Sequence, residues 1–449
     1  MAHLDIQQQA DDLIQLIKTR FITPDGFLAR NYPVTQRTLF DNFDDIVPFF
    51  IYLGETDFLL SQVHRIQQKK ESLVSLCSDN GVLITRNIDE WFGGLFAIWE
   101  ATHDQQVFSL LEDSIEFVNR HLIHNEFLSA AYYSQKDIWV SYYESWSSGL
   151  LETFCEMRDT FPSTFICAQS ILRNWLMHDY VEKYALFPYR IYVSQPRQWI
   201  QNSLISYFPP IQSHSRPLTV QSGFKGVLRK VKFFLINGQY SQLMKSNSTC
   251  AFAMLEFYKA TGDDFWRYHL LKWIDAATNC FIKKGVVHME YTPKIRTLNS
   301  PSITAAFILV DIICDTVYFV QPEIQKNKYL STVKTILDHA WNNRLENGLL
   351  PNSEFENFAH IDNQVDFAIS LRRYAEITGD QNYAEKSQSL ILKTLAVHNS
   401  PDGYVTYSGE VTKQIIDPKY NALLLKGMIS LLTKDQKLYP DLYSLFKDR

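Results

Sequence analysis

The sequence predicts an all-α protein folded as a closed ring of paired helices, and three observations support this fold class. Apolar residues recur at helical spacing through most of the 449 residues. Strand signals are scarce. Two turn motifs alternate along the chain, so that helices of two kinds follow one another. Paired helices bury their inner faces only when the pairs stack. We therefore expect a single domain over residues 1–449, an (α/α)6 or (α/α)7 toroid of outer and inner helices.

The composition limits the class of protein. Hydrophobic residues make up 46% of the chain, aromatic residues 14% and charged residues 20%, which excludes an intrinsically disordered protein. The formal net charge of -6 argues against a general nucleic-acid binder. Residues 1–5 do not have the pattern of a signal peptide, and no apolar run is long enough to span a membrane. We therefore expect a cytoplasmic protein.

The first turn motif joins a polar residue, a glycine and an apolar residue. Glycine supplies the left-handed conformation that stops a helix, so a helix is expected to end at each copy. Asn125-Glu126-Phe127 is a degenerate copy without the glycine. The full copies are centred on Gly26, Gly81, Gly285, Gly348 and Gly403.

The second turn motif is a helix end followed by an acidic turn and an aromatic residue. Thr261-Gly262-Asp263 and Thr378-Gly379-Asp380 are its clearest copies. The aspartate is expected to cap the next helix by accepting its first free N–H groups. Two further helix starts are sharp, because Ser300-Pro301 and Asp417-Pro418 each place a proline directly after a capping residue.

The segments between the motifs predict the helices in order. Segments that follow the acidic turns are flanked by charge and are expected to be outer helices, at 5–20, 57–77, 104–124, 162–180, 264–283, 325–344 and 380–397. Segments that follow the glycine turns are more apolar and are expected to be inner helices, at 45–54, 88–102, 139–158, 247–261, 301–320, 361–378 and 418–432.

These motifs resemble those of the six-hairpin glycosidase superfamily and related α/α toroids. The resemblance rests on residues 257–263 and 373–380 and on the turn Pro401-Asp402-Gly403-Tyr404. As a rhythm it covers most of the chain, and it is specific for architecture rather than for one reaction. It implies a toroid whose relatives include glycoside hydrolases, uronate hydrolases, sugar epimerases and polysaccharide lyases. Similar toroids also serve as terpene cyclases and peptide-modifying enzymes, and some only bind.

In such a toroid the glycine turns and the N-termini of the inner helices share one end, the mouth of the central cavity. Carboxylates there bind sugar hydroxyls or move protons, and aromatic rings stack on pyranose faces. The candidate catalytic residues are Asp44, Asp45, Asp89, Glu144, His360, Asp362 and Asp366. The candidate substrate-binding residues are Arg37, Arg86, Trp91, Tyr143, Trp146, His288, Glu290, Asp417 and Tyr420.

The acidic candidates have structural alternatives. Asp44, Asp45 and Asp89 are also suited to cap or flank helix N-termini, where an acid stabilises a helix by about 0.3–1 kcal/mol. Glu144 falls inside the predicted inner helix 139–158, where a carboxylate needs either a wet cavity or an arginine on a neighbouring helix.

The start of the helix 361–378 carries the most polar candidates. His360 is a base or a sugar ligand in the functional interpretation and a loop residue in the structural one, and Asp362 is the matching cap. Gln364 and Asp366 lie deeper in the helix than a cap requires, which favours a functional interpretation. His288 offers a second histidine, and two histidines across a cavity would suit an epimerase that uses two bases.

A basic insertion at residues 181–245 interrupts the helix rhythm. It contains nine Lys or Arg residues against one Glu, a net charge of +8. Three interpretations stay open: a membrane-surface contact through 224–236, a lid over an anionic or lipid-linked substrate, or a solvated insertion on an acidic ring.

The leading functional hypothesis is a glycoside hydrolase with two carboxylates at the mouth, which are ~5 Å apart in retaining enzymes and ~6.5–9.5 Å apart in inverting ones. The alternatives are a sugar epimerase or uronate lyase that uses His360, His288 or Tyr143, and a toroid that only binds a glycan, lipid or protein. An isoprenoid cyclase is a more distant alternative. No phosphate-binding loop or metal-ligand spacing is present, so no cofactor and no metal are expected.

Overall fold

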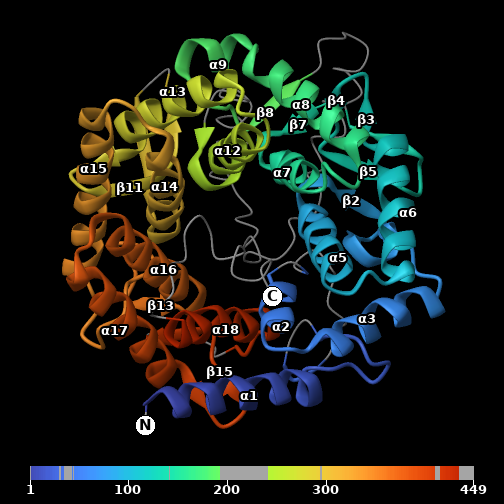
Figure 1. Ribbon diagram of the computed structural model, residues 1–449, viewed down its shortest axis with the longest axis horizontal. Helices are drawn as coiled ribbons and strands as arrows, with labels where there is room; N and C mark the ends of the chain where they lie inside the picture. Colours follow the sequence, from blue (N-terminus) through green and yellow to red (C-terminus); the bar gives the residue numbers. More distant parts are fainter. Residues whose placement is uncertain are drawn as a thin grey trace, which may run out of the picture.

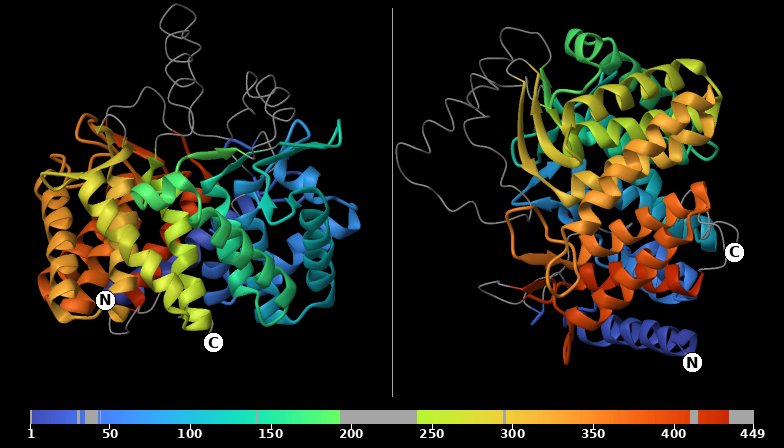
Figure 2. Two further views of the ribbon diagram at one scale, coloured as in Figure 1. Left: turned by 90° about the horizontal axis from the view of Figure 1, so that it is seen from above. Right: turned by 90° about the vertical axis from the view of Figure 1, so that its left-hand side faces the viewer.

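The helices follow one another around a ring in two layers (Figure 1). The structure is a computed structural model that describes residues 2–29, 32–34, 43, 45–140, 142–192, 241–293, 296–409 and 415–433. Figure 2 shows that the short strands gather at one end of the helices. The helical ring agrees with the predicted α/α architecture.

Two sets of helices form the layers. The outer helices are α1 (Ala2–Arg20), α3 (Thr56–Gln68), α6 (Gln105–His121), α8 (Pro162–Leu176), α13 (Asp264–Phe281), α15 (Glu323–Asn342) and α17 (Gln381–His398). The inner helices are α2 (Val47–Tyr52), α5 (Asp89–Thr102), α7 (Gly149–Glu156), α12 (Thr249–Thr261), α14 (Ile303–Thr316), α16 (Ile361–Thr378) and α18 (Pro418–Leu432). The short helices α4 (Leu73–Cys77) and α9 (Asp179–Tyr184) lie outside this alternation.

The first and last described helices, α1 and α18, pack together and close the ring. Helix α18 packs against α1 and α2 on one side and against α16 and α17 on the other. One hydrophobic core runs through the whole ring, from Ile6 on α1 to Ile429 on α18. Within the described residues, no helix has both the length and the apolar character needed to cross a membrane.

The glycine turns at Gly81 and Gly285 form β-hairpins, which corrects the expectation that they simply end helices. Strand β1 (Ser78–Asp79) pairs with β2 (Val82–Ile84) across Asn80 and Gly81, whose φ angles are 53° and 75°. Two consecutive positive φ angles match the right-handed twist of a two-residue hairpin. Such short strands leave no alternating pattern in the sequence, so they were not predicted. The same geometry joins β3 (Ile123–His124) to β4 (Phe127–Leu128) and β10 (Ile282–Lys283) to β11 (Val286–Thr292).

The remaining strands are two to five residues long and lie at the same end of the ring. They are β5 (Ala131–Tyr133), β6 (Ile138–Trp139), β7 (Tyr142–Glu144), β8 (Arg190–Tyr192), β9 (Ser241–Gln242), β12 (Thr297–Pro301), β13 (Phe358–His360), β14 (Asn399–Ser400), β15 (Gly403–Tyr404) and β16 (Tyr407–Gly409).

The acidic turns are built as predicted. Gly262 and Gly379 adopt φ angles of 66° and 75° at the ends of α12 and α16. The Asp263 and Asp380 carboxylates then accept hydrogen bonds from Phe265 N and Asn382 N, at 2.9 and 3.1 Å. These local signals are reliable because both partners of each bond lie within a few residues.

Three predicted helix boundaries are wrong. The segment 57–77 is split, because Ser72 and Ser75 form a capping box that starts α4. Helix α14 begins at Ile303 with Ser302 as its cap, and Pro301 belongs to β12. Glu144 lies on β7, which pairs with β8, and not inside a helix over 139–158. A pairing with a distant segment overrides the local pattern there.

Two predicted site residues and most of the predicted basic insertion lie outside the described residues. They are Arg37, Asp44, residues 193–240 of the basic insertion and therefore all of 224–236.

Buried side-chain amides attach the loops to the inner helices. Asn421 on α18 donates to Tyr404 O and accepts from Tyr404 N, at 2.9 and 2.8 Å. Gln364 on α16 forms the same pair of bonds with Leu350. Both amides are fully buried. This position of Gln364 is structural, which corrects the functional interpretation of its depth in the helix.

Replacing Asn421 by leucine is expected to destabilise the protein by about 2–4 kcal/mol, because the N–H and C=O of Tyr404 would be left buried without partners. Asn421→Asp is a matched control that retains the shape and one acceptor. Urea unfolding measures both variants. An unchanged midpoint for Asn421→Leu would contradict this role of the amide.

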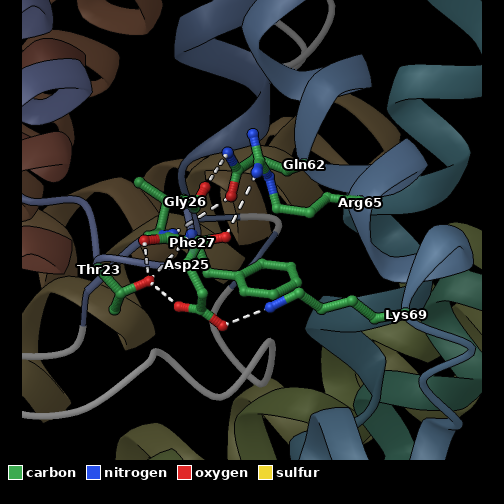
Figure 3. A network of polar contacts seen from close by, with 8 residues as sticks. Thr23, Asp25, Gly26, Phe27, Gln62, Arg65 and Lys69 are labelled. Carbon is green, nitrogen blue, oxygen red and sulfur yellow. Dashed lines mark hydrogen bonds and ion pairs between the residues drawn. The ribbon is translucent and has the colours of Figure 1, made fainter.

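The first glycine turn is held by a network around Asp25, Gly26 and Phe27 (Figure 3). Gln62 on α3 donates to Gly26 O at 3.0 Å, and Lys69 pairs with Asp25 at 2.6 Å. A side chain at Gly26 would overlap the Arg65 guanidinium, and Gly26 also has a φ of 87°. The turn thus requires glycine for both its backbone and its packing.

Candidate active site

Several inner helices have one partly exposed stripe on an otherwise buried surface. On α16 the stripe is Asp362, Asp366 and Arg373, and nearly every residue between them is buried. On α18, Lys426 is the partly exposed residue between Asn421 and Ser430. Because these helices are covered by protein on their outer side, the stripes face the interior of the ring (Figure 1). The stripes are charged, so the interior carries chemically active groups.

Lys419 at the start of α18 joins acids from two other segments. Its Nζ forms an ion pair with Asp45 and lies 3.9 Å from Glu90 Oε2 on α5. Burial opposes its charge, but the Asp45 and Glu90 carboxylates hold the pKa of Lys419 well above its usual value. The Lys419 side chain retains 25% of its exposed area, so the group is accessible to water or a ligand.

Lys426, seven residues further along α18, forms a second ion pair. Its Nζ lies 2.7 Å from Asp366 Oδ1. Arg373 on α16 extends the chain of charges, at 3.3 Å from Asp315 and 3.8 Å from Asp311 on α14. We call Asp45, Asp89, Glu90, Asp362, Asp366, Lys419 and Lys426 the axial cluster.

Asp89, the first residue of α5, is an acid whose pKa is strongly altered. Its Oδ1 accepts a hydrogen bond from Glu90 N at 3.0 Å. Its other oxygen packs against Gly149, the first residue of α7, where a Cβ atom would overlap it. Burial raises the pKa of Asp89 to about 7, and the Asp45 carboxylate acts in the same direction. Asp89 is thus placed to donate or accept a proton near neutral pH.

Asp362 shows the same effect on the facing helix. Burial and the neighbouring Asp366 carboxylate raise the pKa of Asp362 well above its usual value, although Lys419 opposes this. The cluster contains five carboxyl groups and two lysines, so it does not hold all of its acids ionised without large repulsion.

His360 caps α16, which corrects the structural alternative in which Asp362 was the cap and His360 a loop residue. Its Nδ1 accepts a hydrogen bond from Asp362 N at 3.2 Å, so the neutral ring carries its proton on Nε2. The ring packs edge-on against Tyr407 and Tyr420, with centroids 4.9 and 4.5 Å away. Asp362 and Lys419 act electrostatically on the Tyr420 hydroxyl, which places His360 and Tyr420 beside the axial cluster.

Glu144 belongs to a second group, which we call the basic cluster: Arg86, Glu144, Trp146, Arg190 and Lys245. Arg190 binds Glu144 Oε1 through two nitrogens, at 3.0 and 2.7 Å. Arg86 binds Glu144 Oε2 at 3.0 Å. This matches the alternative in which an arginine neutralises the buried acid, so Glu144 is an ion-pair partner here.

Some predicted ligands are core residues. Trp91 is fully buried and donates from Nε1 to Ser114 Oγ, so it offers no face to a sugar. Tyr143 is buried and stacks on Trp175 at 3.9 Å. Their apolar surfaces are used to pack the ring, which corrects both expectations.

Other predicted ligands are separate from the axial cluster. Asp417 caps α18 by accepting from Lys419 N at 2.9 Å. The charges that act on His288 are those of Glu354 and Lys283, so the structure does not join His288 to His360. Glu290 accepts from Gln242 at 3.0 Å and lies close enough to influence Lys245.

Several charged residues of the interior were missed by the sequence interpretation. Lys419 and Lys426 lie seven residues apart in an apolar helix, which places them on one face, and this spacing was available in the sequence. Glu152 on α7 was also missed. Burial and the carboxylates of Glu256, Glu156 and Asp89 raise the pKa of Glu152 well above its usual value.

Two further features lie apart from these clusters. A pocket of about 200 Å³ lies between α8, α9, α12 and α13 and contains none of the axial carboxylates. Among the residues that the structure describes, no three His, Cys, Asp or Glu side chains are grouped as metal ligands.

The fold is shared with solved structures of sugar-processing enzymes. A D-mannose isomerase matches with a TM-score of 0.57 and 9% identity, over 96% of this chain and 97% of its own. An α-1,2-mannosidase from Trichoderma reesei matches with a TM-score of 0.61 and 11% identity, over 96% and 92%. A cellobiose 2-epimerase from Spirochaeta thermophila matches with a TM-score of 0.56 and 8% identity, over 96% and 98%.

Comparison of the sequence alone identifies no relative, in contrast to comparison of the fold. No protein-family model matches the chain, and no curated sequence matches it significantly. The structural neighbours are six-hairpin glycosidase-like enzymes, and the chain has their α/α-toroid fold, as its turn motifs indicated.

Proposed function

We propose that this protein is a carbohydrate-active enzyme and that the axial cluster carries out its reaction as a glycoside hydrolase. The observation that carries this proposal is that the carboxyl groups of the cluster differ in their electrostatic surroundings. Asp89 titrates near neutral pH, whereas Asp45 and Asp366 are paired with lysines. Two carboxyl groups in different protonation states are what an acid–base pair for glycoside cleavage requires.

In this proposal Asp89 is the general acid that protonates the leaving oxygen of the glycosidic bond. The carboxylate of Asp366, on the opposite stripe on α16, activates water or attacks the sugar carbon. Lys419 and Lys426 balance the charge while the proton moves. The partial exposure of these side chains supports access of a ligand.

A sugar epimerase or isomerase is the second candidate, and His360 is the observation that favours it. The ring lies beside Tyr420 and Asp362, with its Nε2–H directed away from the cap. An imidazole beside a tyrosine and an acid is suited to move a proton at a carbon next to a carbonyl. Two of the structural neighbours described above are a D-mannose isomerase and a cellobiose 2-epimerase.

Proton NMR in D₂O separates these functions. The purified protein is incubated with neutral and uronate-containing oligosaccharides. New reducing-end anomeric signals are expected, and they would support hydrolysis. Loss of a ring proton to deuterium, without new reducing ends, would favour the epimerase and His360. If every sugar is left unchanged, the result argues for a toroid that only binds.

A further inference from the structure

The basic cluster has more positive charge than its carboxylates neutralise. Arg86, Arg190 and Lys245 contribute three cations. Glu144 is shared by the two arginines, and Glu290 is bound to the Gln242 amide. The balance of these five groups is one positive charge, although the region is largely buried. Such an excess is costly unless a counter-charge is supplied.

Two donors in this cluster lack an acceptor. Arg86 is more than nine-tenths buried, with 8% of its side-chain area exposed, and its Nε has no hydrogen-bond partner within the part of the chain that the structure describes. Lys245 has no hydrogen bond or ion pair to any residue that the structure describes. Burial and the nearby Arg86 charge lower the pKa of Lys245, although the Glu144 and Glu290 carboxylates act in the opposite direction.

An aromatic face lies between these two cations. The Arg86 guanidinium is 4.3 Å and the Lys245 ammonium 4.9 Å from the Trp146 ring centroid. Trp146 is partly exposed, whereas Ser145 and Ser147 on either side are buried. A ring with adjacent cations can hold the apolar face of a sugar while its acidic group meets the charges.

The backbone places this cluster next to the axial cluster. Lys245 lies in a π-helix (Leu243–Ser248), a geometry often found at functional sites. Arg86 is three residues before Asp89. Trp146 is three residues before Gly149, against which the Asp89 carboxyl packs. Arg86 and Trp146 are therefore each within three residues of a group of the Asp89–Gly149 contact.

We propose that Arg86, Lys245 and Trp146 form a subsite for the anionic group of an acidic sugar, with Arg190 holding Glu144 out of its way. The proposal rests on the proposed function in that the ligand is taken to be a sugar. The net charge of the cluster is matched by one negative charge, which favours the carboxylate of a uronate over the phosphate of a sugar ester.

Binding measured by isothermal titration calorimetry tests this subsite in the full chain. The probes are methyl glucuronide, methyl glucoside and glucose 6-phosphate. The variant is Lys245→Met, which retains the apolar stem, and the matched control is Lys328→Met on the exposed side of α15. The wild type and the control are expected to bind the glucuronide about tenfold tighter than the glucoside, which corresponds to about 1.4 kcal/mol.

Lys245→Met is expected to lose most of this preference and to retain its affinity for the glucoside. Added salt should weaken glucuronide binding alone. Tighter binding of glucose 6-phosphate than of the glucuronide would assign the anion to a phosphate ester. Equal affinity for acidic and neutral sugars, an equal loss of both in Lys245→Met, or no binding of any probe would overturn the subsite.

Turnover assays of the wild type and of Asp89→Asn, run beside these titrations, separate this inference from the proposed function. A preference for the acidic sugar, with no turnover of any sugar by the wild type, would leave the subsite standing and remove the hydrolase. Turnover of neutral sugars without a preference for acidic ones would support the hydrolase and remove the subsite.

Discussion

Asp89→Asn is expected to lower kcat by about 10²–10⁴-fold, the contribution typical of a general acid. An amide retains the shape of the side chain and the hydrogen bond from Glu90 N, but it has no proton to give at neutral pH. In the wild type, turnover that depends on the protonated acid should fall as the pH rises through about 7. The variant should lose this limb of the profile. Steady-state rates between pH 5 and 9 measure both effects.

The stability of Asp89→Asn shows whether lost activity reflects lost structure. The pKa of Asp89 in the folded chain, about 7, lies above its ordinary value of 3.8. Its contribution to stability is therefore fully present below pH 3.8 and is lost as the pH rises through about 7. The amide has no such loss, so the variant should be at least as stable as the wild type at pH 8.

Asp113→Asn, on the exposed side of α6, is the matched control and should leave both activity and stability unchanged. A folded Asp89→Asn protein with wild-type kcat would remove Asp89 from the mechanism. An unfolded one would show that the carboxyl is needed for structure.

Lys419→Met is expected to destabilise the protein by about 3–5 kcal/mol, because Asp45, Glu90 and Asp362 would lose the cation that they face. The pKa of Lys419 is raised in the folded chain, so its contribution is complete below the ordinary value of 10.5 and is lost only at higher pH. The loss in the variant should therefore be full at pH 8. It should shrink at pH 5, because Asp89, whose pKa is about 7, is protonated there and no longer needs the lysine.

Urea unfolding at pH 8 and pH 5 measures this difference. Lys328→Met serves as the control, because Lys328 is about half exposed on an outer helix and its surface ion pair with Asp275 is worth ~1 kcal/mol or less. If Lys419→Met unfolds at the wild-type urea concentration at both pH values, the axial ion pairs do not support the ring.

Much of the fold was predictable because its signals are local. The caps at Asp263, Asp380 and Asp417 and the glycines that end α12 and α16 bond to groups within a few residues of themselves. The alternation of outer and inner helices follows from these turns together with apolar spacing. The hairpins were missed, since most of their strands have only two or three residues and are too short to show a period.

The site was less predictable than the fold, because it depends on the direction in which each side chain points. Asp362 and Gln364 are two residues apart on one helix. The Asp362 carboxyl faces the interior, whereas the Gln364 amide is fully buried and hydrogen-bonded to the backbone of Leu350. Glu144 was placed in a helix, but its partner Arg190 lies 46 residues away and fixes it on a strand. Nothing within a local window encodes such pairings.

The sequence by itself determined the helices, their caps and their alternation, because these depend on bonds between near neighbours and on the 3.6-residue period of a helix. Only the tertiary structure decided which acids meet. Asp45, Asp89, Asp362 and Lys419 come from four separate segments. They share an electrostatic environment because α18 returns to pack against α1 and α2, and this closure turns their stripes toward one interior.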